Sequence, residues 1–354
     1  MLNLVYKGDS GRIVHGDNLV VLSKLPDNFA HSCISDFPYG IDFLGKKWDA
    51  GGKGFYDWCF ARGAALVRVM KPGGFVAIFG HPKQNHRMKS AFEDAGFNIV
   101  EEINWVYVSA MPKSQDIGKL FDKAAGVERP VIGVDEKKLR PNRKPQKDGG
   151  ERVLAGGFSS DNGATITAPV TDLAKQWDGW RTAGLKPAHE PITIFQKPLE
   201  GTYIQNIEKH GCGGFNIPAC KVKSPDEDRF PMNVIFDEDA SELLDFESGE
   251  SLSRLFPVIY NKKVSQSERK LSDGSRNPHV TLKPVALIQW LVRLLTPLSG
   301  VTIDITAGSC THAVACERLN REEGYKLTWL DIELQNTDDE PYCDVGRRRV
   351  EETD

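Results

Sequence analysis

The stretch Ser35-Asp36-Phe37-Pro38-Tyr39-Gly40 follows an apolar pair, Cys33 and Ile34, and predicts a turn that leaves the carboxyl end of a strand. Ligands of open α/β sheets bind at that edge. The turn offers the carboxylate of Asp36, the backbone carbonyl of Phe37, a rigid Pro38 and the aromatic face of Tyr39. Such a set can hold an exocyclic amine by two hydrogen bonds while it stacks the attached ring. Ordinary strand exits share this composition, so the surrounding chain has to decide between the two interpretations.

The composition is that of an ordinary globular protein. The chain has 354 residues, 40% hydrophobic and 27% charged, which allows one large α/β domain with an insertion or two domains. A formal net charge of -4 argues against a protein that coats nucleic acid with most of its surface, but it allows a local basic cleft. Seven cysteines without metal-ligand spacing predict reduced thiols, a cytoplasmic protein and no metal site. No run reaches the roughly 18 apolar residues of a membrane span, so we expect no membrane association.

Strands and helices alternate in both terminal thirds of the chain. The first third predicts strands at 12–15, 30–34, 75–80 and 98–108, with helices between them at 19–25, 56–70 and 81–95. The last third predicts a buried helix at 285–295, a strand at 301–304, a helix at 312–320 and a strand at 327–330. This alternation is typical of a doubly wound α/β sheet.

A second turn, Thr306-Ala307-Gly308-Ser309-Cys310-Thr311, follows the strand that ends at Asp304. Small residues there let a ligand approach the backbone, and the next helix offers free N–H groups to a carboxylate. About one βαβ step later comes Asp331-Ile332-Glu333, where a carboxylate either binds two ribose hydroxyls or merely closes the strand. Asp17, after the first strand, can contact an adenine amino group or cap the following helix.

Between residues 110 and 275 the alternation breaks, and positive charge gathers in one segment. That segment contains Lys137, Lys138, Arg140, Arg143, Lys144 and Lys147 without an intervening acid. Such a run is either a solvated face or a segment that contacts nucleic-acid phosphates.

The order of these features resembles the β class of amino-directed DNA methyltransferases, of phage or prophage type. Their signature is Asp/Ser/Asn-Pro-Pro-aromatic, and Asp36-Phe37-Pro38-Tyr39 differs from it only at Phe37. Segments 185–192, 211–217 and 229–235 are also similar to segments of phage members. The resemblance implies a Rossmann-like α/β methyltransferase sheet with a circularly permuted motif order. Its two halves would be residues 1–110 and 276–354, and residues 111–275 would form a target-recognition insertion.

The resemblance also implies a reaction: transfer of a methyl group from S-adenosylmethionine to the exocyclic amine of a base flipped out of double-stranded DNA. Adenine N6 is favoured over cytosine N4 because the turn begins with Asp36. Asp36 and the Phe37 carbonyl would accept the amine hydrogens, and Tyr39 would stack the base with Trp105 opposite. Thr281 and Lys283 would close the methionine end of the cofactor. The implied cofactor contacts are Asp17, Thr281, Lys283, Asp304, Thr306, Gly308, Ser309, Cys310, Thr311, Asp331 and Glu333. We expect a monomer or homodimer.

Three positions depart from the family pattern. Phe37 replaces a proline, Thr306 replaces an aromatic residue, and Cys310 replaces a glycine that is free to take positive φ. These departures leave two alternatives open, a catalytically silent descendant that binds DNA and an enzyme that uses an altered donor.

Overall fold

The computed structural model describes residues 3–41, 54–108, 114–135, 165–224, 227–259, 269–279 and 281–353. The chain forms two compact units. Unit 1 comprises Met1–Ser109 and Ala188–Asp354, and unit 2 comprises Ala110–Pro187.

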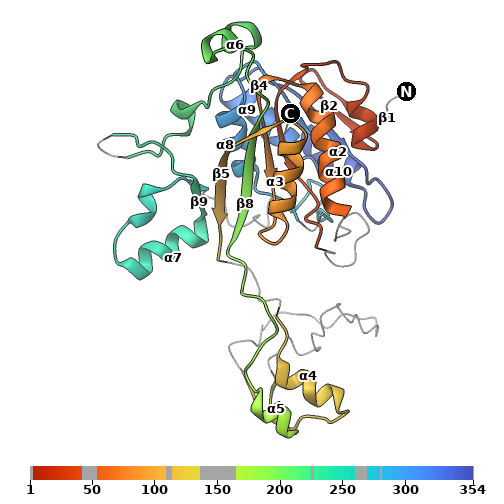
Figure 1. Ribbon diagram of the computed structural model, residues 1–354, viewed down its shortest axis with the longest axis vertical. Coiled ribbons are helices and arrows are strands. Elements are labelled where there is room, and N and C mark those ends of the chain that lie inside the picture. Colours follow the sequence, from red (N-terminus) through yellow and green to blue (C-terminus); the bar gives the residue numbers. More distant parts are fainter. Residues whose placement is uncertain are drawn as a thin grey trace. The chain divides into compact units, whose positions relative to one another are not determined.

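Unit 1 is built on one mixed sheet, which has ten strands among the described residues (Figure 1). In sheet order these are β1 (Asn3–Lys7), β2 (Gly11–His15), β12 (Thr328–Glu333), β11 (Val301–Asp304), β3 (Ala30–Asp36), β4 (Met70–Phe79), β8 (His189–Gln196), β5 (Asn98–Val106), β9 (Val234–Asp237) and β10 (Val258–Ile259). The five strands from β2 to β4 are parallel to one another, whereas β8 is antiparallel to both of its neighbours. The carboxyl ends of β2, β12, β11 and β3 therefore meet at one edge.

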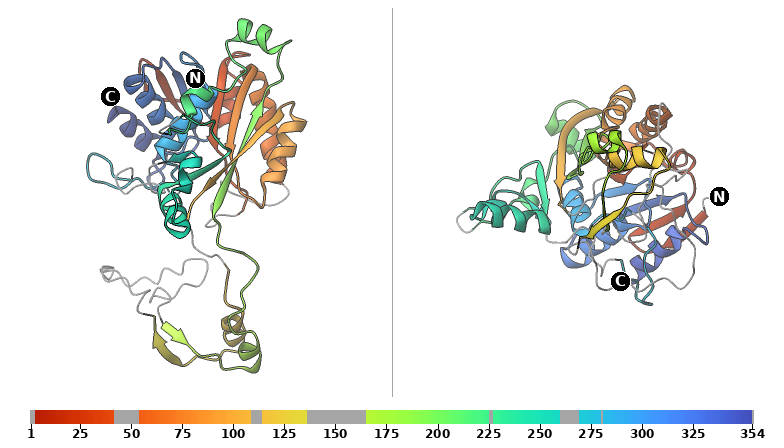
Figure 2. Two further views of the ribbon diagram at one scale, coloured as in Figure 1. Left: turned by 90° about the vertical axis from the view of Figure 1, so that its left-hand side faces the viewer. Right: turned by 90° about the horizontal axis from the view of Figure 1, so that it is seen from below.

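Helices cover both faces of the sheet (Figure 2). One layer contains α1 (Asn18–Leu22), α2 (Gly54–Val69) and α3 (Asn85–Asp94), and the other contains α8 (Val285–Leu295), α9 (Thr311–Glu322) and α10 (Tyr342–Glu351). Two further helices, α6 (Tyr203–His210) and α7 (Glu238–Ser248), and two 3₁₀ turns, at Ile217–Cys220 and Leu252–Leu255, lie in the connections of the carboxyl-terminal segment. Because helices cover both faces, central strands are apolar along their length, as in β4, where residues 74–79 are all buried.

The predicted α/β alternation is confirmed, with three differences. Strand β1 pairs antiparallel with β2, and the sequence pattern did not predict it. Helix α2 ends at Val69 and β4 begins at once, so the Lys71-Pro72-Gly73-Gly74 stretch lies within β4 as a bulge. Gly73 has φ +76 there, a conformation that glycine adopts without strain.

The third difference concerns the expected insertion over 111–275. Strand β8 lies between β4 and β5, and β9 and β10 extend the sheet beyond β5. Residues from Ala188 onward therefore belong to unit 1, because β8 is the strand that joins β4 to β5 in its sheet. The compact inserted unit is Ala110–Pro187, shorter than predicted.

Unit 2 contains α4 (Ile117–Ala124), β6 (Val131–Val134), β7 (Thr165–Thr167) and α5 (Asp172–Gln176), with β6 and β7 antiparallel. Its buried polar centre is Asp122, which accepts hydrogen bonds from the backbone N–H and hydroxyl of Thr171 and pairs with Arg129 at 3.2 Å. These bonds hold the pKa of Asp122 below its usual value even though burial opposes them. Among the described helices of either unit, none is long and apolar enough to cross a membrane.

Candidate active site

Four adjacent strands of unit 1 place the predicted site residues at one edge of the sheet. Asp17 follows β2, Glu333 ends β12, the 306–311 turn follows β11, and Asp36 ends β3. Carboxyl ends of parallel strands are where α/β sheets bind ligands. Residues that are far apart in the sequence thus become neighbours through the strand order alone.

The Asp36 carboxylate is held from one side by a buried lysine. Lys283 Nζ lies 2.5 Å from Asp36 Oδ2, 3.4 Å from Glu190 Oε2 and 3.1 Å from the Tyr39 hydroxyl oxygen. The ammonium also lies over the ring of Phe79, 5.0 Å from its centroid. Lys283 was predicted to close the methionine end of the cofactor. The structure places its ammonium beside Asp36 at the end of β3, and its contact with a cofactor stays a prediction.

Glu190, at the start of β8, completes this cluster. It accepts hydrogen bonds from the hydroxyls of Tyr39, at 2.9 Å, and Tyr107, at 3.2 Å. Sequence reasoning missed both Glu190 and Tyr107 as site residues. The available signal was the segment 185–192, which was singled out in the sequence but gives no hint of its position in the sheet.

Burial controls the protonation of this cluster. Desolvation raises the pKa of Asp36, and the nearby Lys283 only partly offsets it. Burial would lower the pKa of Lys283, but Asp36 and Glu190 outweigh that effect and raise it. Burial also raises the pKa of Tyr39. The lysine is therefore charged and Tyr39 keeps its proton.

The other oxygen of Asp36 is the most informative atom of the site. Oδ1 is buried and has no hydrogen-bond partner among the described residues, although an unpaired buried acceptor costs about 1–3 kcal/mol. A ligand that donates a hydrogen bond would satisfy it.

Two of the three departures from the family pattern are accommodated around this turn. The Phe37 ring is 2% exposed and points into the core, where it packs edge-on against Trp58 at 5.1 Å and against Phe92 at 6.0 Å between centroids. The Thr306 hydroxyl donates to the backbone carbonyl of Asp36 at 3.0 Å. The small-residue turn is thereby tied directly to the catalytic turn.

At the small-residue turn, Glu333 is 8% exposed and accepts the N–H groups of Gly308, at 2.6 Å, and Gln335, at 2.7 Å. Burial raises the pKa of Glu333 to about 7. Asp17 is half-buried and accepts the N–H groups of Leu19 and Val20 as the N-cap of α1. The capping alternative for Asp17 is therefore present, and its adenine contact stays a prediction.

The side chains of Ser309, Cys310 and Thr311 point into the protein and are 1%, 0% and 8% exposed. The Ser309 hydroxyl accepts hydrogen bonds from Asn277 Nδ2 at 2.9 Å and Arg349 Nη1 at 3.1 Å. These side chains are therefore committed to packing and to hydrogen bonds within the protein.

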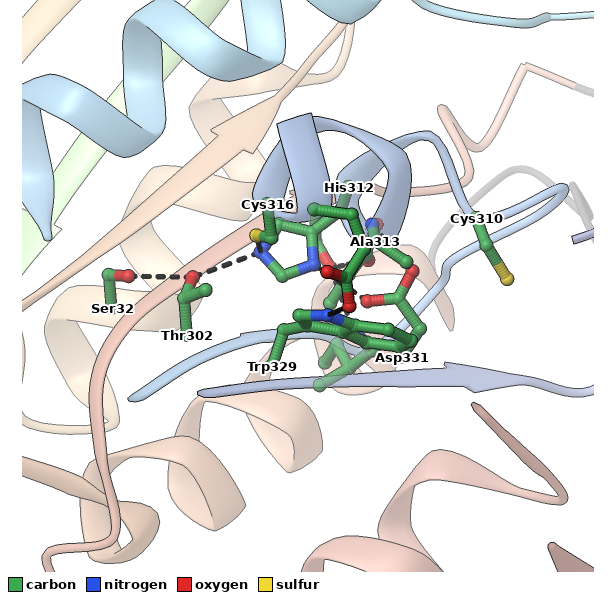
Figure 3. A network of polar contacts seen from close by, with 12 residues as sticks. Ser32, Thr302, Cys310, His312, Ala313, Cys316, Trp329 and Asp331 are labelled. Carbon is green, nitrogen blue, oxygen red and sulfur yellow. Dashed lines mark hydrogen bonds and ion pairs between the residues drawn. The ribbon is translucent and has the colours of Figure 1, made fainter. Parts of the chain in front are cut away.

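Asp331, the alternative ribose ligand, lies in the core (Figure 3). Its Oδ1 is 2.6 Å from His312 Nδ1, its Oδ2 accepts the N–H of Ala313, and both charged side chains are almost completely buried. His312 Nε2 lies 3.0 Å from Thr302 Oγ1. Burial opposes charge on His312, but its contacts with Cys316 and Asp331 raise its pKa well above the usual value. The predicted ribose role of Asp331 is therefore wrong for this geometry, because its carboxylate is committed to this internal pair.

Asp304 has a similar internal role. Its Oδ1 accepts hydrogen bonds from the Ser35 hydroxyl at 2.5 Å and from the N–H of Thr306 at 3.0 Å. Burial, followed by the nearby charge of Asp331, raises the pKa of Asp304 to about 7. Asp304 thus shapes the turn between β11 and α9.

The remaining predictions have different outcomes. Trp105 has no exposed surface and packs edge-on against Tyr107 inside β5, so its predicted base-stacking role is wrong for this geometry. Pro38 and Thr281 are half-buried, and the contact predicted for Thr281 is untested. The basic cluster at 137–147 lies outside the described residues.

A protein-family model described as DNA methylase, of the N6/N4 methyltransferase type, matches residues 30–337. The chain belongs to this family. It is an S-adenosylmethionine-dependent enzyme of the N6-adenine/N4-cytosine DNA methyltransferase family.

Individual relatives agree with the family assignment. The chain is 23% identical over 350 residues to the type II methyltransferase M.HindIII of Haemophilus influenzae, covering 87% of this chain and 88% of the relative. It is 31% identical to M.BamHI of Bacillus amyloliquefaciens over 83 residues, 22% of this chain and 19% of that one. The solved PvuII DNA methyltransferase, described as cytosine-N4-specific, shares the fold with a TM-score of 0.53 at 15% identity, covering 99% of this chain and 96% of that one.

The residues at the sheet edge fit S-adenosylmethionine. Gly308 has φ +54, and its N–H donates to the buried Glu333 carboxyl, which ties the small-residue turn to the end of the neighbouring strand. Helix α9 begins at Thr311. A carboxyl group at the end of the neighbouring strand suits ribose hydroxyls, and a helix start suits a carboxylate.

Proposed function

We propose that this DNA amino-methyltransferase methylates the exocyclic amine of a base taken out of double-stranded DNA, with adenine N6 favoured over cytosine N4. The observation that carries the proposal is the buried Asp36 Oδ1, which has no partner among the described residues. Phe37 follows Asp36 in the same turn, and its backbone carbonyl is a second hydrogen-bond acceptor. A turn that begins with Asp favours adenine.

In this mechanism the two oxygens of Asp36 have separate tasks. Lys283 lies 2.5 Å from Oδ2, which orients the carboxylate and favours its ionised form against the desolvation that raises its pKa. Oδ1 then accepts one amine hydrogen and the Phe37 carbonyl accepts the other. Acceptors that are oriented in advance cost no reorganisation when charge develops on the nitrogen.

The charges near Asp36 also favour transfer of a methyl group to the amine nitrogen. Asp36 and Glu190 bring two carboxyl groups to one ammonium, so these three groups carry a net negative charge when both acids are ionised. An amine nitrogen becomes positive as it gains a methyl group, and a net negative pocket stabilises that change. Tyr39, held by its hydroxyl to Glu190, offers its ring for stacking the base.

S-adenosylmethionine would supply the methyl group as an electrophile. Glu333 would hold its ribose, Asp17 its adenine amino group, and the backbone of the 308–311 turn its methionine part. Positioning the two reactants in line is the main contribution that the chain makes.

We further propose that unit 2, with the basic segment 137–147, contacts the DNA and helps select the target. The type II relatives suggest a restriction-modification setting in a bacterial or phage-infected cell. The enzyme would act as a monomer or homodimer, and its mass in solution distinguishes the two.

The test is nucleoside mass spectrometry of DNA incubated with the purified protein and S-adenosylmethionine. We expect one added methyl group on adenine N6. Methylation of cytosine N4 would keep the chemistry and overturn the base preference. Unmodified DNA without cofactor binding in calorimetry would instead support a silent descendant, and another added mass would support an altered donor.

Two variants locate the chemistry. Asp36→Asn should abolish methylation while leaving the calorimetric affinity for S-adenosylmethionine within about twofold. The matched control is Asp228→Asn, which changes a half-buried carboxylate paired with the exposed Lys223 and should leave both properties unchanged. Loss of cofactor affinity in Asp36→Asn would contradict the role assigned to Asp36.

A further inference from the structure

Helix α10 lies beside the small-residue turn but outside the segment that the family match covers. The match ends at residue 337, whereas α10 spans Tyr342–Glu351. Two residues on its inner side, Gly346 and Arg349, face the turn. Both residues are buried, on the side of α10 that packs against α9.

Gly346 makes room for the side chain of Cys310. Cys310 has φ +58 and ψ +46 and is the N-cap of α9, a left-handed conformation that costs a residue with a Cβ roughly 1–2 kcal/mol. A Cβ added at Gly346 would lie 2.4 Å from Cys310 Sγ and 2.9 Å from Cys310 Cβ. Helix α10 can therefore pack here only because residue 346 has no side chain.

Arg349 contacts the next residues of the turn. Its Nη1 donates to the Ser309 carbonyl at 2.6 Å and lies 3.1 Å from both the Ser309 and the Thr311 hydroxyl oxygens. The guanidinium is almost completely buried, with Arg349 7% exposed. Hydrogen bonds from a charged donor are stronger than those between neutral groups, so these contacts favour one conformation of the short turn.

We propose that α10 is a brace for the cofactor turn, in which Arg349 is a positioning residue and Gly346 is matched to Cys310. The brace holds the turn in the left-handed conformation after glycine has been replaced by cysteine. It rests on the proposed use of S-adenosylmethionine at this turn. Its consequence is that the backbone of the turn, in which the N–H groups of Gly308 and Cys310 already donate to Glu333 and to the Ala307 carbonyl, keeps the one conformation that a cofactor would meet.

The Gly346–Cys310 match is tested by a double-mutant cycle. Gly346→Ala should weaken binding of S-adenosylmethionine in calorimetry by about tenfold, because the new methyl group displaces the turn. Adding Cys310→Gly to that variant removes the sulfur and should restore most of the affinity. Gly214→Ala is the control, since a Cβ at Gly214 meets nothing within 4 Å.

Arg349 is tested by a graded pair of variants. Arg349→Gln should raise the KM for S-adenosylmethionine about tenfold with kcat at saturation little changed, and Arg349→Lys should recover part of the loss. Arg347→Gln changes an arginine of the same helix that is paired with Glu351 at the surface, and it should leave KM unchanged. Thermal melting of each variant confirms that the protein measured is folded.

The outcomes separate the brace from the proposed function. Wild-type protein that binds S-adenosylmethionine, with weakened Gly346→Ala and a rescued double variant, supports the brace. Wild-type binding with unchanged affinity in Gly346→Ala and Arg349→Gln, or a double variant no better than Gly346→Ala, overturns the brace alone. Absence of binding by the wild type overturns the proposed function and the brace's role with it.

Discussion

Replacing Lys283 by methionine removes the buried cation that pairs with Asp36 and Glu190. Methionine has a similar length and no charge, so the space is largely kept and the electrostatic effect is isolated. The lysine is 7% exposed and its nitrogen lies 2.5 Å from Asp36 Oδ2. Removing one partner of a buried ion pair is strongly destabilising, by about 3–5 kcal/mol.

The loss has a ceiling, because Asp36 can bind a proton instead of remaining an unpaired charge. At pH 7, protonating a carboxyl group whose unfolded pKa is about 3.9 costs about 4 kcal/mol, at 1.36 kcal/mol per pH unit. This ceiling falls to about 1.5 kcal/mol at pH 5. The variant should therefore lose about 3–4 kcal/mol of unfolding free energy at pH 7 and much less at pH 5.

The sign follows from the pKa of Asp36, which burial already raises in the wild type. Without Lys283 that pKa rises further. A carboxyl group with a raised folded pKa opposes folding only above its unfolded pKa, so the deficit of the variant should grow as pH rises. Methylation by Lys283→Met should also need a higher pH, because only ionised Asp36 offers both oxygens as acceptors.

Urea denaturation of wild type and variant between pH 5 and pH 8 measures this. Lys223→Met is the control, since Lys223 pairs with Asp228 at the surface, where its side chain is 85% exposed and such pairs contribute about 0–1 kcal/mol. A Lys283→Met deficit that is the same at every pH, or no larger than that of the control, would refute the assigned charge pairing.

Three further outcomes are expected. Phe37→Ala should lower the unfolding free energy by about 3–5 kcal/mol in urea denaturation, because the ring fills the core, while the folded fraction keeps its affinity for S-adenosylmethionine; an unchanged stability would contradict the packing. Wild-type stability should fall by about 3 kcal/mol between pH 4.5 and pH 8 through Glu333, whose folded pKa of about 7 exceeds its unfolded value. Glu333→Gln should reduce the total fall in stability by about this amount, leaving the part that Asp304 contributes with its own pKa of about 7, and should weaken cofactor binding; an unchanged pH dependence would contradict the assignment to Glu333. Asp331→Asn should lower the unfolding free energy by about 3–5 kcal/mol, because it breaks the buried pair with His312. The affinity for the cofactor in calorimetry should stay unchanged. A large loss of that affinity would restore the ribose role to Asp331.

The sequence predicted the strands and helices of both terminal thirds because their apolar patterns are local. It also predicted which turns lie at the ligand edge, since the carboxyl ends of parallel strands must meet there. The helix over 285–295 and the strand over 301–304 have the predicted bounds. Such elements depend on neighbours in the sequence rather than on distant contacts.

The partners of the charged side chains were not predictable in the same way. Asp331 and Glu333 are two residues apart on one strand, yet only Glu333 reaches the strand end, while Asp331 meets His312 of α9. Lys283 and Glu190 approach Asp36 across long sequence separations, and no local pattern records such a meeting. The place of β8 in the sheet was missed for the same reason, since its pairing with β4 and β5 is non-local.

Strands β2 and β3 follow each other in the chain but are separated in the sheet by β12 and β11, which come from residues 301–333. During synthesis, the first half of the molecule therefore emerges with a gap two strands wide and unpaired edges on both sides. Such edges are prone to wrong pairing, and long-range closure of this kind is slow. Strands β11 and β12 follow the other described strands in the chain, and they close the gap and create the ligand edge in the same step, so this edge cannot form before residue 333 has been synthesised.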